Sequence, residues 1–274
     1  MVRKMNKIAY LAKFLIYAIS DPKRGKETFK TKYQSMHNSV ADLYDYGSKQ
    51  QNLEEIIDTL FPNYVITIQD ALKNTQKLQD HIADFFNHLR SEKYPSKKKP
   101  YPTEYSIDDK SGLFLYILCK LAKPELIVET GVAYGLSSMY ILQAFEENKK
   151  GSLHSIDGIF SPWQTMEMIG SAIPSNLKNR WSIHFGSSAE NLHNVLSSLR
   201  SVDIFFHDSL HTYKNMIFEY ETAWPHIKNG GFLFSDDILG NNAFYDFKLD
   251  KKTRSFILSN NAHSSFGVIE KHLM

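Results

Sequence analysis

From about position 105 onward, short apolar runs alternate with segments of helical periodicity along the chain. The runs are bounded by glycine and polar turn residues and are too short for helices, so they are typical of buried strands. They lie at Leu126–Thr130, Leu153–Asp157, Trp181–Phe185, Val202–His207 and Phe232–Phe234. Strands that alternate with helices predict an α/β fold with a doubly wound, mainly parallel sheet and helices on both of its faces.

The first hundred residues have a different pattern, which is helical and poor in glycine. The run Ile8–Ile19 is apolar apart from one lysine, and two stripes with a period near 3.6 follow it. The stripes consist of Leu53, Ile56, Ile57, Leu60 and Phe61, and of Leu72, Leu78, Ile82, Phe85 and Leu89. The proline-rich segment Glu92–Pro102 resists both helix and sheet, so we place the domain boundary there. Residues 1–100 are thus a helical extension and residues 101–274 a second domain.

Three roles are open for this extension. Its stripes can cap the cleft of the second domain, or they can form a dimerisation surface. The run Ile8–Ile19 is shorter than the roughly twenty residues that span a bilayer, and it lacks a small-residue cleavage site typical of signal peptides. Its aromatic residues, with Lys4 and Lys7 beside them, leave open a peripheral contact of residues 8–19 with a membrane.

Composition and charge narrow the choice of partners. The chain of 274 residues has 32 Lys and Arg and 30 Asp and Glu, and its net charge of +2 gives no electrostatic case for nucleic acid. Its single cysteine, Cys119, lies in an apolar run and cannot form an internal disulfide, which is consistent with a reducing compartment. We therefore expect a cytoplasmic protein, with membrane-peripheral contact left open.

The first strand of the second domain ends in a glycine turn. Gly131 and Gly135 would let a ligand lie against the backbone, and the helix that follows presents unpaired N–H groups. The alternative is an ordinary β–α turn. The next strand ends at Asp157, which could accept hydrogen bonds from both hydroxyls of a ribose, and the turn at Ser188 could contact an adenine ring. The ends of parallel strands line one crevice, so these residues should converge.

At these positions the chain resembles the class I S-adenosylmethionine-dependent methyltransferases. Lys123–Ser138 is similar to the first motif of that family, and Leu153–Asp157 is similar to the second. Val202–Tyr213 and Trp224–Asp237 resemble the branch of macrocin-type sugar O-methyltransferases and cephalosporin-hydroxylase-like proteins. The resemblance extends from about Tyr105 to Lys271 and implies a seven-stranded Rossmann-like sheet whose last strand is antiparallel.

The resemblance also implies a reaction and a binding site. The expected activity is transfer of a methyl group from S-adenosyl-L-methionine to a hydroxyl of a small polar acceptor, such as a sugar or a glycosylated metabolite. We expect a homo-oligomer. The residues expected to bind the cofactor are Glu129, Thr130, Gly131, Tyr134, Gly135, Ser137, Asp157, Ser188 and Asp208.

The same motifs suggest a metal and a base. Asp208, Asp236 and Asp237 end adjacent strands, and oxygen ligands of this kind hold Mg²⁺, which would lower the pKa of the acceptor hydroxyl. The alternative is that Asp236 and Asp237 only cap a helix or solvate a loop. His211 matches the histidine of the motif, so we expect His211 and Asp208 to be catalytic. His207 would point to the other side of the strand, and we interpret it as structural.

One position departs from the motif of the branch, because Leu210 replaces its second acid and Ser209 replaces its glycine. If that acid is essential, the protein could be metal-independent, use His211 alone, or be a non-catalytic or hydroxylase-like relative whose extension binds a partner or a membrane. A doubly wound oxidoreductase is disfavoured, because the glycine spacing does not match that of dinucleotide sites.

Overall fold

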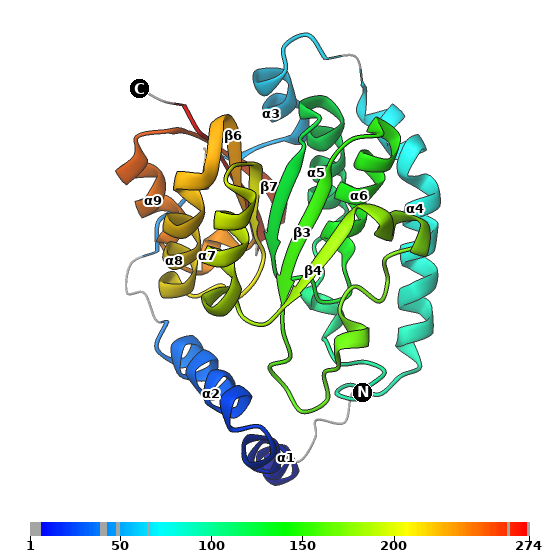
Figure 1. Ribbon diagram of the computed structural model, residues 1–274. Coiled ribbons are helices and arrows are strands. Elements are labelled where there is room, and N and C mark those ends of the chain that lie inside the picture. Colours follow the sequence, from blue (N-terminus) through cyan, green and yellow to red (C-terminus); the bar gives the residue numbers. More distant parts are fainter. Residues whose placement is uncertain (1–6, 39–42, 48–49, 65, 262–263, 273–274) are drawn as a thin grey trace.

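The computed structural model describes residues 7–38, 43–47, 50–64, 66–261 and 264–272. Its core is one eight-stranded sheet with the order β1-β7-β8-β6-β5-β2-β3-β4 (Figure 1). Only β8 among these strands is antiparallel to its neighbours, β6 and β7. The strands are β1 (Gln50–Gln51), β2 (Leu126–Thr130), β3 (Ser152–Asp157), β4 (Trp181–Phe185), β5 (Val202–His207), β6 (Ile227–Ser235), β7 (Arg254–Asn261) and β8 (Ser264–Glu270).

The predicted fold class is confirmed, with one addition. The seven expected strands are present and the last one is antiparallel, as expected. The eighth strand is β1, which comes from the helical extension and pairs in parallel with β7 at the sheet edge. Two polar residues cannot be recognised as a strand from hydrophobic periodicity, so the sequence did not reveal it.

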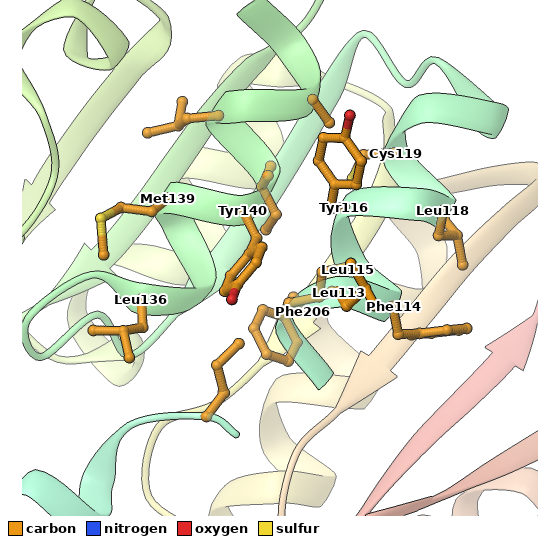
Figure 2. Packing of buried hydrophobic residues seen from close by; sticks show 14 of the residues in the cluster. Leu113, Phe114, Leu115, Tyr116, Leu118, Cys119, Leu136, Met139, Tyr140 and Phe206 are labelled. Carbon is orange, nitrogen blue, oxygen red and sulfur yellow. The ribbon is translucent and has the colours of Figure 1, made fainter. Parts of the chain in front are cut away.

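Helices cover both faces of the sheet. One apolar core lies between the sheet and α3 to α6, and a second lies between the sheet and α7 to α9. Figure 2 shows α5 and α6 in the first core, with Tyr140 and Phe206 close to the apolar side chains of α5. The helices of the two layers are α3 (Leu53–Leu60), α4 (Ile68–Arg90), α5 (Asp109–Ala122), α6 (Leu136–Asn148), α7 (Ser188–Leu199), α8 (Tyr213–Ala223) and α9 (Ala243–Lys251).

Short 3₁₀ turns connect several of these elements: η2 (Thr103–Tyr105), η3 (Met166–Met168), η4 (Ser175–Arg180), η5 (Trp224–His226) and η6 (Ile238–Gly240). At the start of α5, the carboxylate of Asp108 accepts a hydrogen bond from the backbone N–H of Ser111 at 2.8 Å. Asp108 is therefore the cap of this helix, and it enters the wall of the cavity described below.

The two helices α1 (Lys7–Ser20) and α2 (Pro22–Met36) stand apart from the layers of the sheet, at one end of the molecule (Figure 1). They contact the loop that follows β3. The hydroxyl of Tyr17 donates to the carbonyl of Ile159 at 3.2 Å, and the hydroxyl of Thr28 donates to the carbonyl of Phe160 at 3.0 Å. Within the described ranges, no helix combines the length and the apolar character needed to cross a bilayer.

Candidate active site

A cavity of about 680 Å³ opens where the parallel strands β2, β3, β5 and β6 end. Its volume is in the range of sites that enclose small molecules and cofactors. The strand ends and the turns after them contribute one part of the wall: Thr130, Gly131, Val132, Ala133, Asp157, Gly186, Ser187, Ser188, Asp208, Ser209, Leu210, His211, Asp236 and Asp237. The carboxyl ends of the strands thus converge, as the topology predicts.

The β2 turn and the end of β3 form one side of this cavity. The carboxylate of Asp157 accepts backbone hydrogen bonds from Val132 at 3.0 Å and from Ala133 at 2.9 Å on one oxygen. Its other oxygen accepts a bond from Gly158 at 2.6 Å. A carboxylate has about four acceptor positions, so Asp157 retains one for a ligand hydroxyl rather than the two that a pair of ribose hydroxyls would use.

Gly131 fixes the spacing between this turn and the neighbouring strand end. Its φ is +85°, and a Cβ at this position would lie 1.9 Å from the carbonyl oxygen of Asp208. Glycine is therefore required both for the backbone conformation and for the close approach of the β5 end. As a result, the glycine turn and the acidic cluster are positioned by the same contact.

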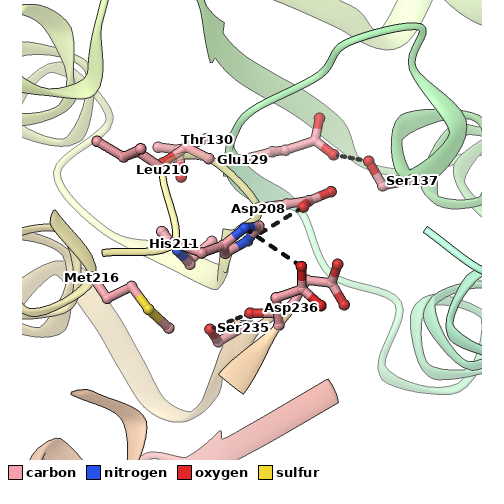
Figure 3. Close-up of polar contacts among 12 residues, drawn as sticks. Glu129, Thr130, Ser137, Asp208, Leu210, His211, Met216, Ser235 and Asp236 are labelled. Carbon is pink, nitrogen blue, oxygen red and sulfur yellow. Dashed lines mark hydrogen bonds and ion pairs between the residues drawn. The ribbon is translucent and has the colours of Figure 1, made fainter. Parts of the chain in front are cut away.

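Glu129 lies behind the cavity wall. Its carboxylate is fully buried and accepts hydrogen bonds from three serine hydroxyls, those of Ser137 at 2.5 Å, Ser138 at 2.7 Å and Ser155 at 2.7 Å. Figure 3 shows the bond from Ser137. Burial raises the pKa of Glu129, and the three serine donors oppose that rise. This network joins β2, β3 and α6, so it holds the glycine turn from behind.

Four of the nine expected cofactor residues do not line the cavity: Glu129, Tyr134, Gly135 and Ser137. The Tyr134 hydroxyl donates to the carbonyl of Tyr101 at 3.0 Å, and its ring packs among aromatic neighbours. Gly135 precedes α6 with a φ of 94°. The other five, which are Thr130, Gly131, Asp157, Ser188 and Asp208, lie in the wall.

The opposite side of the cavity carries an acidic cluster. Ligand atoms of Asp208, His211 and Asp236 all lie within 4.8 Å of one another, an arrangement that could hold a metal ion. The ring of His211 lies between two carboxylates, with Nε2 3.7 Å from Asp208 and Nδ1 3.7 Å from Asp237 (Figure 3). Its Nε2 is buried and has no hydrogen-bond partner. The structure therefore brings Asp208, His211 and Asp236 together, and Asp237 lies beside His211 but outside this group of possible ligands.

The electrostatics of this cluster favour a positive charge. Burial raises the pKa of Asp208 well above its usual value, and the charges of Asp236 and Glu129 raise it further. Burial raises the pKa of Asp236 most, the charge of Asp237 raises it further, and the resulting pKa is about 7. Burial lowers the pKa of His211, and the neighbouring His207 adds to this effect, so the ring is neutral at neutral pH. A cation among these groups would relieve the repulsion between the acids.

A buried network of polar side chains, centred on Glu219, lies next to the cluster. Glu219 of α8 accepts hydrogen bonds from His207 at 2.6 Å, Thr130 at 2.5 Å and Ser209 at 2.7 Å. Burial raises the pKa of Glu219, but His207 and the other donors lower it more, to about 2. The expectation that His207 is structural agrees with its complete burial. Glu219 itself was missed, because it lies in a helix twelve residues after His207 and no sequence motif contains it.

The helical extension and the boundary segment supply further parts of the wall. Thr28, Thr31, Lys32 and Ser35 of α2 line the cavity. The boundary segment contributes Tyr94, Pro100, Tyr101 and Pro102. The sequence marked this segment only as a domain boundary, whereas in the structure its prolines and tyrosines at these positions line the site. No local pattern could have indicated this.

A family model matches the central part of the chain. Residues 128–238 match a family model described as a methyltransferase domain, and this segment contains the glycine turn, Asp157 and the acidic cluster. This match supports an enzyme of the methyltransferase type. A search of the curated proteins found no matching sequence.

Solved structures share the fold. An O-methyltransferase from Bacillus cereus in complex with S-adenosylhomocysteine matches with a TM-score of 0.53 and 15% identity, over 80% of this chain and 97% of that chain. A Podospora anserina methyltransferase bound to S-adenosylhomocysteine gives 0.51 and 12%, over 86% and 100%. The O-methyltransferase TomG from Streptomyces achromogenes, in complex with S-adenosylmethionine, gives 0.50 and 13%, over 82% and 100%. At these identities the likeness is one of fold.

Proposed function

We propose that this protein is an S-adenosylmethionine-dependent O-methyltransferase that uses a divalent cation and acts on a small polar acceptor. One observation carries the proposal: a single cavity has a glycine turn and Asp157 on one side and the cluster of Asp208, His211 and Asp236 on the other. A cofactor held by the first side would present its methyl group toward an acceptor held by the second.

The cofactor site is built from the strand ends. Gly131 gives access to the backbone of the turn, and the free acceptor position of Asp157 can bind a ribose hydroxyl. Ser188 lies in the wall where an adenine is expected. The hydroxyl of Thr130 donates to Glu219, and Glu129 accepts a hydrogen bond from Ser138 at the start of α6. Thr130 and Glu129 can therefore position the cofactor site without contacting the cofactor. S-Adenosylmethionine, when bound, supplies an activated methyl group.

A divalent cation fits the opposite side. The mutual repulsion of Asp208, Asp236 and Asp237 and the unpartnered Nε2 of His211 are the features expected where a cation belongs. Carboxylate oxygens suit Mg²⁺, and the nearby imidazole also allows Mn²⁺. Such an ion supplies Lewis-acid polarisation of a coordinated oxygen. With Leu210 in the wall, the acid missing from the branch motif is replaced by an apolar contact.

His211 is the candidate base. Its neutral ring can take the proton of an acceptor hydroxyl, and Asp208 and Asp237 on either side would stabilise the imidazolium that forms. The backbone of the His211 loop is fixed by hydrogen bonds from Asn38 and Asn241 to its carbonyl, at 3.4 and 3.3 Å. The base is therefore held on two sides by other parts of the chain.

The acceptor is proposed from resemblance and from the wall of the cavity. The motifs around Asp208 and Asp236 resemble those of macrocin-type sugar O-methyltransferases, which favours a sugar or glycosylated metabolite. Thr28, Thr31 and Ser35 of α2 line the cavity. The hydroxyls of Thr28 and Ser35 already donate to the carbonyls of Phe160 and Thr31, so they would offer acceptor positions to a polyhydroxylated molecule. In this proposal α2 acts as a cap over the acceptor.

Calorimetric titration with S-adenosylmethionine and S-adenosylhomocysteine, with and without Mg²⁺ or Mn²⁺, tests the proposal, with NAD as a control. We expect both sulfur compounds to bind and NAD not to bind. With an acceptor found by screening sugars, Asp236→Asn should abolish the cation dependence, and His211→Gln should lower kcat by roughly 10²-fold or more. Asp84→Asn, on the exposed side of α4, is the matched control. Absence of binding by both sulfur compounds would overturn the proposal.

A further inference from the structure

Positive charge is concentrated in the first 36 positions of the chain. This stretch holds nine of the 32 Lys and Arg residues but two of the 30 Asp and Glu residues. Its net charge is therefore +7, and the remaining residues together carry −5, although the whole chain has only +2. Such an asymmetry is typical of a segment that meets an anionic partner.

The helix α2 within this stretch has two different faces. Thr28, Thr31 and Ser35 face the cavity. The other face is exposed and mixes cations with large apolar side chains: Lys26, Phe29, Lys30, Tyr33 and Met36, at spacings of three and four residues. Phe29 is 71% exposed and Met36 is 80% exposed, values that a side chain without a covering partner would show.

An exposed apolar stripe also runs along α1. Leu15, Ile16 and Ile19 are 65%, 68% and 79% exposed, and their spacing places them on one side of the helix. The opposite side is attached to the body, where the Phe14 ring meets Trp163 edge to face at 5.6 Å and Tyr17 donates to Ile159. Because each helix faces the body with one side, both apolar stripes point away from it.

The two helices form one rigid unit. A Cβ on Gly25 of α2 would lie 2.6 Å from the Cα of Ala18 in α1, so the backbones cross in close contact. Two polar contacts attach this α1–α2 hairpin to the rest of the protein. The ammonium of Lys23 lies 2.6 Å from the carboxylate of Glu190, and Glu27 accepts a hydrogen bond from Ser187. The exposed stripes are therefore held in place on a preformed surface.

We propose that the α1–α2 hairpin docks this protein on an anionic membrane surface, with its outer face in the headgroup region. Apolar side chains interleaved with lysines are the composition of interfacial helices, and each cation near an anionic bilayer adds to binding. A second copy of the chain fits less well, because a two-fold contact would place the lysines of one hairpin against those of the other. Nucleic acid would leave the aliphatic side chains of α1 without a partner.

This docking does not depend on the proposed reaction, but it has a consequence for the site. The inner face of α2 lines the cavity and its outer face would rest on the membrane, so one helix would separate the acceptor site from the bilayer. The surface would then hold the cavity within reach of acceptors that are themselves bound at the membrane.

Co-sedimentation of the full chain with lipid vesicles tests the docking. We expect binding to vesicles of phosphatidylcholine mixed with phosphatidylglycerol, little binding to phosphatidylcholine alone, and release at high salt. Lys26→Glu with Lys30→Glu should weaken the partition at least about tenfold, because two cations near the surface are reversed. Ile16→Ser with Ile19→Ser should weaken it as well, through loss of the inserted apolar stripe.

The matched control is Lys73→Glu with Lys77→Glu, which reverses two exposed lysines with the same spacing on α4. This control should bind vesicles like the unmodified chain, and circular dichroism should show that every variant keeps its helical content. Failure of the unmodified chain to bind anionic vesicles would overturn the proposal, as would equal losses in the α2 and α4 pairs. A concentration-dependent dimer that the α2 pair abolishes, without vesicle binding, would assign the face to a second copy instead. None of these readouts requires methyl transfer, so the two proposals fail independently.

Discussion

Glu129 and Asp208 belong to adjacent central strands, yet their surroundings are opposite in kind. Glu129 is surrounded by three hydroxyl donors that stabilise its charge. Asp208 faces Asp236, Asp237 and a neutral His211, so its surroundings repel its charge. The first carboxylate has its hydrogen-bond donors within the chain, whereas the cation that we propose would relieve the repulsion at the second.

In the proposed function, this difference separates a structural acid from a functional one. Burial raises the pKa of both carboxylates, so a raised pKa alone does not distinguish them. What distinguishes them is the chemistry of the neighbours, because hydroxyl donors compensate for burial and like charges add to it. The cavity confirms the distinction, since Asp208 lines it and Glu129 does not.

Gly131→Ala should have the largest effect, because this residue couples the two regions. The new Cβ would overlap the carbonyl of Asp208 at 1.9 Å, and the φ of +85° would be strained. We expect a loss of about 2–5 kcal/mol in the free energy of unfolding, with weaker binding of both the cofactor and the cation. Urea denaturation and calorimetry measure these quantities.

Gly240→Ala is the control for this substitution, because no heavy atom lies within 4 Å of a Cβ built there. It should leave stability and both binding reactions nearly unchanged. Unaltered cation binding in Gly131→Ala would show that the two regions are independent of each other.

Asp236→Asn should change how stability depends on pH when no cation is present. The pKa of Asp236 is raised from 3.8 to about 7, so between these values the folded state binds more protons than the unfolded state. Stability therefore falls as pH rises through this window, by on the order of 2–4 kcal/mol from this group. The Asn variant lacks this loss, and should be more stable than the unmodified protein above pH 7.

Urea denaturation in EDTA at several pH values measures this difference, and addition of Mg²⁺ or Mn²⁺ should stabilise the unmodified protein but not Asp236→Asn. Asp84→Asn should follow the unmodified protein throughout. If Asp236→Asn were the less stable protein at pH 8 in EDTA, the acidic cluster would be a satisfied structural network like that of Glu129.

The sequence was sufficient for the elements that carry local patterns. Apolar runs ending in Gly131, Asp157, Asp208 and Asp236 predicted the strands, and the topology of parallel sheets predicted that their ends converge. It could not separate the roles of these acids. Glu129 and Asp157 both follow apolar strand residues, and only the fold shows that Ser137, Ser138 and Ser155 surround the former.

Contacts between residues that are far apart in the sequence explain the other features of the site that the sequence did not predict. Asn38 reaches the carbonyl of His211 across 173 positions, and Thr28 reaches Phe160 across 132. No hydrophobic stripe was identified in the segment that forms α2, so periodicity does not say where its inner face packs.

Glu129→Gln should affect stability but not cation binding. The amide keeps the shape of the side chain, but its NH₂ group cannot accept the hydroxyl hydrogen bonds that one carboxylate oxygen receives. We expect a loss of about 1–3 kcal/mol in the free energy of unfolding. Cation titration should give the affinity of the unmodified protein. Loss of cation binding on the scale of Asp236→Asn would place Glu129 in the functional group of acids.

Ala133→Gly should have the smallest effect, although it lies in the turn itself. Ala133 has a φ of 47°, a left-handed conformation that costs a non-glycine residue about 1–2 kcal/mol. Glycine removes this strain but gains about 0.4–1 kcal/mol of freedom in the unfolded chain, so the two effects nearly cancel. The backbone N–H that donates to Asp157 at 2.9 Å is retained. The free energy of unfolding should therefore shift by less than about 1 kcal/mol, with cofactor affinity within about threefold.

A large loss of cofactor affinity, measured by calorimetry beside unchanged stability, would show that the Ala133 methyl group contacts the cofactor directly. The turn would then recognise its ligand through a side chain as well as through its backbone.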